Sequence, residues 1–220
     1  MIHLLNLLAA IALLVWGTQL VRTGILRIFG EKLRNILAHS MGSRPRAVAS
    51  GLLVTSLVQS STATCLIVAS FLGRNLVPLS AALAAMLGAD IGTSLMAVVF
   101  SLDLSWLSPL LIFVGVVNVI TREKTTAGRL GRVAIGLGLI LMSLKLIMAS
   151  TQPLLQAPAM RTLLASLPND VMLEIVVGAG LALLAYSSLA IVLLTATLAG
   201  SGLLPMPVAL GIVLGANVGS

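Results

Sequence analysis

Apolar runs of roughly 20 residues recur along most of this chain, and their recurrence restricts what the chain can fold into. A helix needs about 20 mainly apolar residues to cross about 30 Å of bilayer hydrocarbon. The 220 residues are 59% hydrophobic and only 9% charged, whereas about a quarter of the residues of a soluble domain are charged. The sequence therefore predicts an all-α integral membrane protein, with no sizeable soluble domain between the runs.

The basic residues, which give the chain a net charge of +7, gather in two stretches between apolar runs. Short cytoplasmic loops of membrane proteins are enriched in lysine and arginine, so we expect both stretches inside. Asp103 and the stretch that holds Arg161 and Asp170 carry no such excess, and we expect them outside. This distribution accounts for the positive charge without a nucleic-acid partner. The two stretches hold Arg22, Arg27, Lys32, Arg34, Arg44 and Arg46, and then Arg122, Lys124, Arg129 and Arg132.

The chain contains an internal repeat: an offset of 127 positions brings residues 51–93 onto residues 178–220 without a gap. Apolar composition would match leucines and alanines, but it would not also align a Ser-Ser pair, a proline and the glycines of G-A-x-x-G. We therefore interpret the offset as a duplication, with a first repeat over 1–121 and a second over 131–220 that lacks a counterpart of 94–121. The identical residues are, in first-repeat numbers, Gly51, Leu57, Ser60, Ser61, Ala63, Leu66, Ala69, Gly73, Leu76, Pro78, Ala82, Leu83, Leu87, Gly88, Ala89 and Gly92.

The two repeats are expected to lie upside down relative to each other. If both basic stretches are inside, an even number of crossings separates them, yet three apolar segments lie there, 47–72, 76–101 and 104–121. The segment 47–72 has polar residues at its midpoint, which favours a re-entrant hairpin that does not cross. Its counterpart, 171–199, would then enter from outside. Inverted-topology repeats, each with a re-entrant hairpin and a broken transmembrane helix (76–101 in the first), are typical of secondary transporters.

A segment between the first membrane run, 4–21, and the first hairpin has apolar residues at helical spacing opposite basic ones. It includes Ile25, Phe29 and Leu33 opposite Arg27 and Lys32. This pattern predicts an interfacial amphipathic helix. A linker that carries the positive-inside signal would explain the same pattern, so we assign it no chemistry.

Polar residues cluster at the midpoints of both predicted hairpins, as Gln59-Ser60-Ser61-Thr62-Ala63-Thr64 and as Tyr186-Ser187-Ser188. A buried hydroxyl or amide costs about 1–3 kcal/mol unless it is hydrogen-bonded, so this many polar side chains need partners. Single serines in membrane helices usually bond back to a helix carbonyl or to a neighbouring helix. A cluster that is duplicated at two hairpin midpoints favours a binding site.

A second motif, Gly88-Ala89-Asp90-Ile91-Gly92-Thr93-Ser94, recurs as Gly215-Ala216-Asn217-Val218-Gly219-Ser220. A carboxylate at the middle of an apolar segment costs about 2.5–3.5 kcal/mol, which a bound cation would offset. The glycines would let the helix open and free carbonyl oxygens, which are ligands that sodium prefers. A protonated or ion-paired Asp90 is the alternative.

No catalytic residue is expected, and no cofactor apart from a coupling ion. Lys145 could form a serine-lysine dyad with Ser60 or Ser61, but it lies within a turn or two of the end of its membrane run. There its ammonium group can reach the interface. His3 and His39 lie near predicted interfaces and have no acidic partner in the pattern. Enzyme chemistry is therefore disfavoured.

These motifs resemble the type II sodium/phosphate cotransporters, which carry Q-S-S-S/T in each of two inverted repeats, each followed by G-A/S-N-I-G-T. The resemblance covers 47–101 and 174–220 and implies a sodium-coupled phosphate carrier of a bacterial-type inner or plasma membrane. The substrate residues that it implies are Gln59, Ser60, Ser61, Thr62, Ser187 and Ser188, and the sodium-proximal residues are Thr64, Asp90, Thr93 and Asn217.

The second repeat departs from the family pattern, because Tyr186 replaces a glutamine and Leu189 and Ile191 replace hydroxyl residues. Asp90 also replaces an asparagine.

The expected partners are inorganic phosphate, Na⁺ and the lipid bilayer, and a homo-oligomer is compatible with the sequence. Two other readings stay open. One is a membrane scaffold or regulatory subunit that has lost transport, and the other is a sodium-coupled carrier for another small anion, such as a carboxylate.

Overall fold

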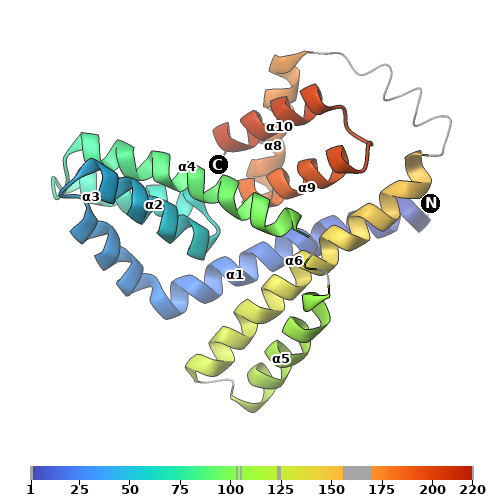
Figure 1. Cartoon of the computed structure of the whole chain (residues 1–220), viewed down its shortest axis with the longest axis horizontal. Helices are drawn as coiled ribbons and strands as arrows, with labels where there is room; N and C mark the ends of the chain where they lie inside the picture. The colour runs from blue at the N-terminus through green and yellow to red at the C-terminus, as the bar shows by residue number, and fades with distance from the viewer. Residues whose placement is uncertain (1, 103, 105, 123–124, 156–169, 220) are drawn as a thin grey trace. The chain divides into compact units, whose positions relative to one another are not determined.

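Helices dominate the computed structural model, which describes residues 2–102, 104, 106–122, 125–155 and 170–219. Asp103, Arg161 and Ser220, on which sequence predictions fall, lie outside these ranges. Over the described residues the chain is all-α, as predicted, and it divides into two units. One unit comprises Met1–Gln19, Phe100–Ile112 and Gly136–Ser220, and the other comprises Leu20–Val99 and Phe113–Ile135. The helices are α1 (Ile2–Ser40), α2 (Arg44–Val58), α3 (Ser61–Gly73), α4 (Leu79–Ser101), α5 (Leu107–Thr121), α6 (Thr126–Leu155), α8 (Val171–Ala185), α9 (Ser188–Gly200) and α10 (Met206–Val218) (Figure 1).

Three of the described helices are long and apolar enough to cross a membrane: Ile2–Ser40, Leu79–Ser101 and Thr126–Thr151. Helix α4 also has a continuous exposed apolar stripe at a spacing of three to four residues, a spacing that places side chains on one helix face. The stripe suits contact with lipid chains rather than with water. The same stripe recurs on α10. The stripe residues are Leu79, Leu83, Leu87, Ile91, Leu95 and Val98 on α4, and Met206, Leu210, Leu214 and Val218 on α10.

The duplication read from the sequence is reproduced helix by helix. Adding 127 to the bounds of α2 and α3 gives the bounds of α8 and α9, and α10 begins 127 residues after α4. The turns match as well. Gln59 and Tyr186 each have a left-handed backbone, with φ of 56° and 51°. Ser60 and Ser187 each cap the following helix, and each side-chain oxygen accepts a 3.2 Å hydrogen bond from the amide three residues later.

Glycines hold α2 against α4 at backbone distance. A Cβ atom on Gly51 would overlap the carbonyl oxygen of Ala85, and one on Gly88 would overlap the carbonyl oxygen of Val48. A Cβ on Gly92 would lie 2.8 Å from the carbonyl oxygen of Leu52. Small residues permit this close approach between membrane helices, where packing rather than hydrophobic burial drives association.

The same three contacts recur 127 residues later between α8 and α10. Here Gly178, Gly215 and Gly219 face the carbonyl oxygens of Ile212, Ile175 and Ala179. One pair differs between the repeats. Where the first repeat has two buried alanines, Ala47 and Ala84, the second has a buried Glu174 whose carboxylate lies against Gly211.

The predicted break in 76–101 is wrong, because α4 runs without interruption through Gly88 and Gly92. The glycines in this structure receive the backbone of α2 rather than open the helix. Helical structure is interrupted instead between α2 and α3, at Gln59 and Ser60.

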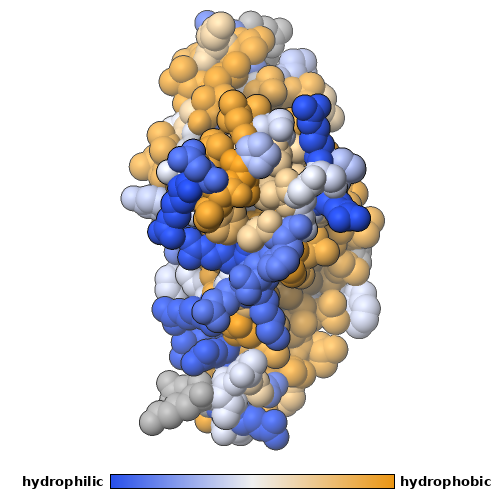
Figure 2. Space-filling view, turned by 90° about the vertical axis from the view of Figure 1, so that its left-hand side faces the viewer, coloured by the Kyte–Doolittle hydropathy of each residue, from blue (hydrophilic) through white to orange (hydrophobic). Residues whose placement is uncertain are grey.

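The amphipathic segment is the second half of α1 rather than a separate helix. Its apolar residues Leu33 and Leu37 are 2% and 0% exposed and belong to the core formed with α2, α3 and α4. Arg34 lies over the ring of Phe71, 5.7 Å from its centroid. Figure 2 shows hydrophilic side chains gathered in a band on one face, and Lys32, Arg34, Arg44 and Arg46 are exposed. The interfacial position of the segment stays a prediction.

Replacing Gly178 with alanine tests the backbone contact, because the new Cβ would overlap a carbonyl that a side-chain rotation cannot move. We expect the substitution to destabilise the protein by about 1–3 kcal/mol. Gly180 lies two residues away on the same helix, and a Cβ atom added there would meet no atom within 4 Å, so Gly180→Ala is the matched control. Thermal unfolding of the purified protein should separate the two variants. Equal melting temperatures would contradict the packing described here.

Candidate functional site

The first polar cluster forms the turn between α2 and α3, and the chain reverses direction there. The hydroxyl of Thr55 donates a 2.8 Å hydrogen bond to the hydroxyl of Thr64. In a straight helix, residues nine apart are separated by about 13 Å along the axis. The bond therefore requires a hairpin, with Gln59 and Ser60 at its tip.

The hairpin tip presents the N-terminus of α3. The first amides of a helix have no intrahelical acceptor, and here the Ser60 side chain caps the amide of Ala63. Ser60 and Ser61 are buried, and Thr62 is half-buried. The amides of Ser61 and Thr62 lie at the first two helical positions, where the helix dipole favours an anion.

Two polar atoms beside this tip are buried without a hydrogen-bond partner among the described residues. They are the Oε1 atom of Gln59 and the Oγ atom of Ser56. Ser56 lies in the last turn of α2, and Gln59 is the left-handed residue that follows the last residue of this helix. A buried polar atom without a partner costs about 1–3 kcal/mol, and a bound ligand would offset this cost. Sequence reasoning singled out Gln59 but missed Ser56.

The second hairpin tip is less polar. Ser188 is buried like its counterpart Ser61, but Ser187 is only half-buried and Tyr186 is 77% exposed. At the position equivalent to Ser56 stands Leu183, which is also exposed. The second tip therefore keeps its helix N-terminus and both serines, and it lacks the buried Ser-Gln pair.

The hydroxyl pair inside the first hairpin becomes an apolar pair in the second. The residues equivalent to Thr55 and Thr64 are Ala182 and Ile191, which belong to one apolar cluster with Ala185 and Ala216. The second hairpin thus loses both hydroxyls and has a smaller side chain at one position and a larger one at the other. Ile191 therefore packs in the apolar interior where the first repeat has a polar threonine.

The predicted sodium residues occupy different environments. Thr64 is buried, and its hydroxyl contacts Thr55 and the carbonyl oxygen of Ser60, the latter at 3.2 Å. Thr93 is buried, and its hydroxyl donates to the carbonyl of Ala89 at 3.3 Å. Asp90 lies on an exposed face of α4.

Thr55 connects the two motifs of the first repeat. A Cβ atom added to Gly92, the neighbour of Thr93, would lie 3.0 Å from the Cβ of Thr55, so these two residues are in close contact. The hydroxyl of Thr55 bonds to Thr64. Asn217 is exposed on α10 and belongs to the other unit. Among the described residues, no group of three or more His, Cys, Asp or Glu side chains could hold a metal ion.

Apolar helices of membrane-spanning length and a duplicated helical hairpin with a serine-capped tip define the class of this protein. It is a helical membrane protein built on an internal duplication. The chain belongs to the Na⁺/Pi-cotransporter family, whose pattern matches residues 13–150 and again residues 147–220. The two matches together take in residues 13–220.

Curated relatives cover the whole of this chain. It is 54% identical over 220 residues to a Salmonella typhimurium protein described as "Putative inorganic phosphate export protein YjbB". It is 53% identical to the protein of the same description from Escherichia coli K12. In each case the alignment takes in 100% of this chain and 40% of the relative, so the chain spans less than half of their length. No solved structure matches the chain.

The Thr55-Thr64 bond can be tested by copying the second repeat into the first. Thr55→Ala alone removes the bond and leaves a gap, and we expect a loss of about 1–3 kcal/mol in stability. The double variant Thr55→Ala/Thr64→Ile reproduces the Ala182-Ile191 pair and should recover most of that loss. Chemical unfolding of the three proteins measures this. A double variant no more stable than Thr55→Ala would show that the two hairpins are packed differently.

Proposed function

We propose that this protein is a sodium-coupled carrier of inorganic phosphate that works by alternating access. The observation that carries the proposal is the tip of the first hairpin. This tip has a helix N-terminus with two buried serines, and beside it two buried side-chain oxygens, of Ser56 and Gln59, have no partner among the described residues. Membership of the Na⁺/Pi-cotransporter family and the description of the relatives support phosphate as the substrate.

Phosphate would bind at the hairpin tips through uncharged donors. The amides at the start of α3, the hydroxyls of Ser60, Ser61 and Thr62 and the Gln59 side chain would serve the anion in the first repeat. Ser187 and Ser188 at the start of α9 would serve it in the second. Gln59 can donate through its amide nitrogen and accept from a protonated phosphate oxygen through Oε1. Anions bind at helix N-termini through such amides without a basic side chain.

Sodium would neutralise the bound phosphate. Helices α3, α4, α8, α9 and α10 contain no lysine, arginine or histidine, so these helices supply no cation. Bound Na⁺ would compensate the anion, with Thr64, Asp90, Thr93 and Asn217 as its nearby oxygen ligands. Either ion alone would leave an uncompensated buried charge, and this mutual dependence couples the two ions.

The two repeats would be inverted, with one re-entrant hairpin entering from each side of a bacterial inner or plasma membrane. Alternate exposure would follow from rocking of one repeat, 1–121, against the other, 131–220. A symporter runs in the direction that the combined gradients favour. The relatives are described as export proteins, and export fits this mechanism when internal phosphate is high.

The less polar second hairpin favours one rival, a membrane scaffold or regulatory subunit without transport. Exposed Tyr186 and buried Leu189 and Ile191 replace groups that could bind an ion. A carrier would be protected against thermal unfolding by phosphate in the presence of sodium, whereas a scaffold would not. A carrier for a carboxylate would instead show uptake that phosphate fails to inhibit.

Transport by the purified protein in proteoliposomes tests the proposal. An inward sodium gradient should drive accumulation of labelled phosphate, and a potassium gradient of equal size should not. Gln59→Leu should reduce the initial rate at least about tenfold, because it removes one ligand of a buried charged substrate. Tyr186→Leu is the matched control at the equivalent position and should keep the rate near that of the wild type.

Three outcomes would contradict the proposal. Phosphate uptake that is equal in sodium and potassium would refute the coupling. Equal losses in Gln59→Leu and Tyr186→Leu would show that the first hairpin tip has no special role. Absence of both flux and sodium-dependent phosphate protection would favour the scaffold.

A further inference from the structure

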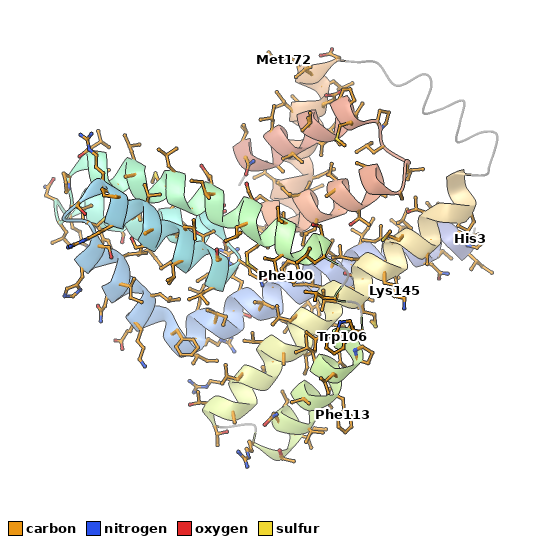
Figure 3. All side chains as sticks on the ribbon, in the orientation of Figure 1. His3, Phe100, Trp106, Phe113, Lys145 and Met172 are labelled. Carbon is orange, nitrogen blue, oxygen red and sulfur yellow. The ribbon has the colours of Figure 1, made fainter. Side chains whose placement is uncertain are left out.

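A cavity of about 670 Å³ lies within one unit, away from the hairpin tips, where the end of α4 and the following residues meet α6 and α9. Its volume falls in the range of small-molecule sites, about 300–1,000 Å³. Figure 3 labels Phe100 at the C-terminal end of α4 and Lys145 on α6. We call this space the α4-α6-α9 cavity. Its lining residues are Phe100, Ser101, Leu102, Leu104, Leu141, Leu144, Lys145, Met148, Ala149, Leu193, Ala196, Thr197 and Gly200.

The lining combines an apolar floor with one charge at the rim. Phe100 and Leu141 are each 6% exposed and Leu193 is 2% exposed, so these side chains form the floor. Lys145 is exposed, and among the residues that the structure describes it is the one charged side chain that lines the cavity. Thr197 offers little polarity, because its hydroxyl already donates to the carbonyl of Leu193 at 2.7 Å.

The Lys145 ammonium group forms no ion pair or hydrogen bond within the described part of the chain. An unpaired cation beside a hydrophobic cavity complements a ligand that is anionic at one end and apolar along the rest. Inorganic phosphate fits this lining poorly, because it would lose its hydration shell against apolar walls and gain a single cation in return.

The predicted topology places the cavity at the outer surface of the membrane. From Arg132 in the inner basic stretch to Lys145 is about 20 Å along α6, which carries Lys145 most of the way across about 30 Å of hydrocarbon. The end of α4 and the end of α9 are also expected outside, from the crossing count and from the inverted hairpin. Three elements assigned separately to the outer side thus meet in one cavity.

We propose that the α4-α6-α9 cavity binds an anionic phospholipid of the outer leaflet. The lipid phosphate pairs with Lys145 at the rim, and an acyl chain covers Phe100, Leu141 and Leu193 on the floor. Basic side chains between membrane helices recognise lipid headgroups in this way. The depth of the site rests on the topology given under the proposed function, while the cavity and its chemistry do not depend on transport.

Retention of lipid by the purified protein tests this directly. The protein is equilibrated with equal amounts of phosphatidylglycerol and phosphatidylcholine of matched acyl chains, and bound lipid is counted by native mass spectrometry. The wild type should retain phosphatidylglycerol in preference. Lys145→Gln should lower that preference about tenfold, the scale expected for one charge-assisted hydrogen bond. Ala196→Phe should displace both lipids by filling the cavity.

Lys32→Gln is the matched control, because Lys32 is an exposed lysine that does not line the cavity. It should leave lipid retention unchanged. The inference is overturned if Lys145→Gln retains phosphatidylglycerol as the wild type does, or if Lys32→Gln loses as much. It is also overturned if millimolar inorganic phosphate displaces the lipid, since the cavity would then be a phosphate subsite. None of these readouts requires transport, so the proposal can fail while the carrier function stands, and the reverse.

Discussion

The close contact of α2 with α4, and of α8 with α10, is the constraint on which the rest of the structure depends. In each pair a glycine on one helix and two on the other receive backbone carbonyls from the partner helix. In a bilayer the surrounding lipid is as apolar as the side chains, so hydrophobic burial gives little drive to helix pairing. This backbone contact is made twice with the same geometry. It fixes the first arm of each hairpin against a neighbouring helix, and so fixes where the hairpin tip lies.

The two tips share a backbone and differ in chemistry. Both have a left-handed residue followed by a capping serine, so the N-terminus of the next helix is presented in the same way. The polar atoms that lack partners belong to the first tip alone among the residues that the structure describes at the two tips. A duplicated fold has therefore kept two anion-compatible helix starts, and one of them carries more groups that need a ligand.

Much of the fold could be predicted because identical residues recur in a single register. Once Ser60-Ser61 meets Ser187-Ser188, the bounds of the paired helices follow, and the structure has them 127 residues apart. The break expected at Gly88 and Gly92 was wrong because a glycine pattern permits both an opened helix and a close helix contact. Only the position of α2, which no local pattern reveals, distinguishes the two.

The candidate site was predicted in part. Gln59, Ser60 and Ser61 stood out because polar residues are costly in an apolar run. Thr55 and Ser56 did not, because single hydroxyls in a membrane helix usually bond back to the preceding turn. Their roles depend on the fold: Thr55 bonds across the hairpin, and the Ser56 hydroxyl is buried without a partner among the described residues. Ser56 lies only three positions before Gln59 in the sequence, so a search of the turn that precedes the motif could have included it.

The central claim is that two copies of one hairpin unit face opposite sides of the membrane. The equivalent residues Arg74 and Ser201 follow α3 and α9, and each can be replaced by cysteine after the native Cys65 is changed to alanine. Labelling of intact cells with a membrane-impermeant maleimide, before and after permeabilisation, measures the side on which each cysteine lies. The account predicts that the cysteine at 201 is labelled in intact cells and the cysteine at 74 only after permeabilisation. Labelling of both from the same side would contradict it.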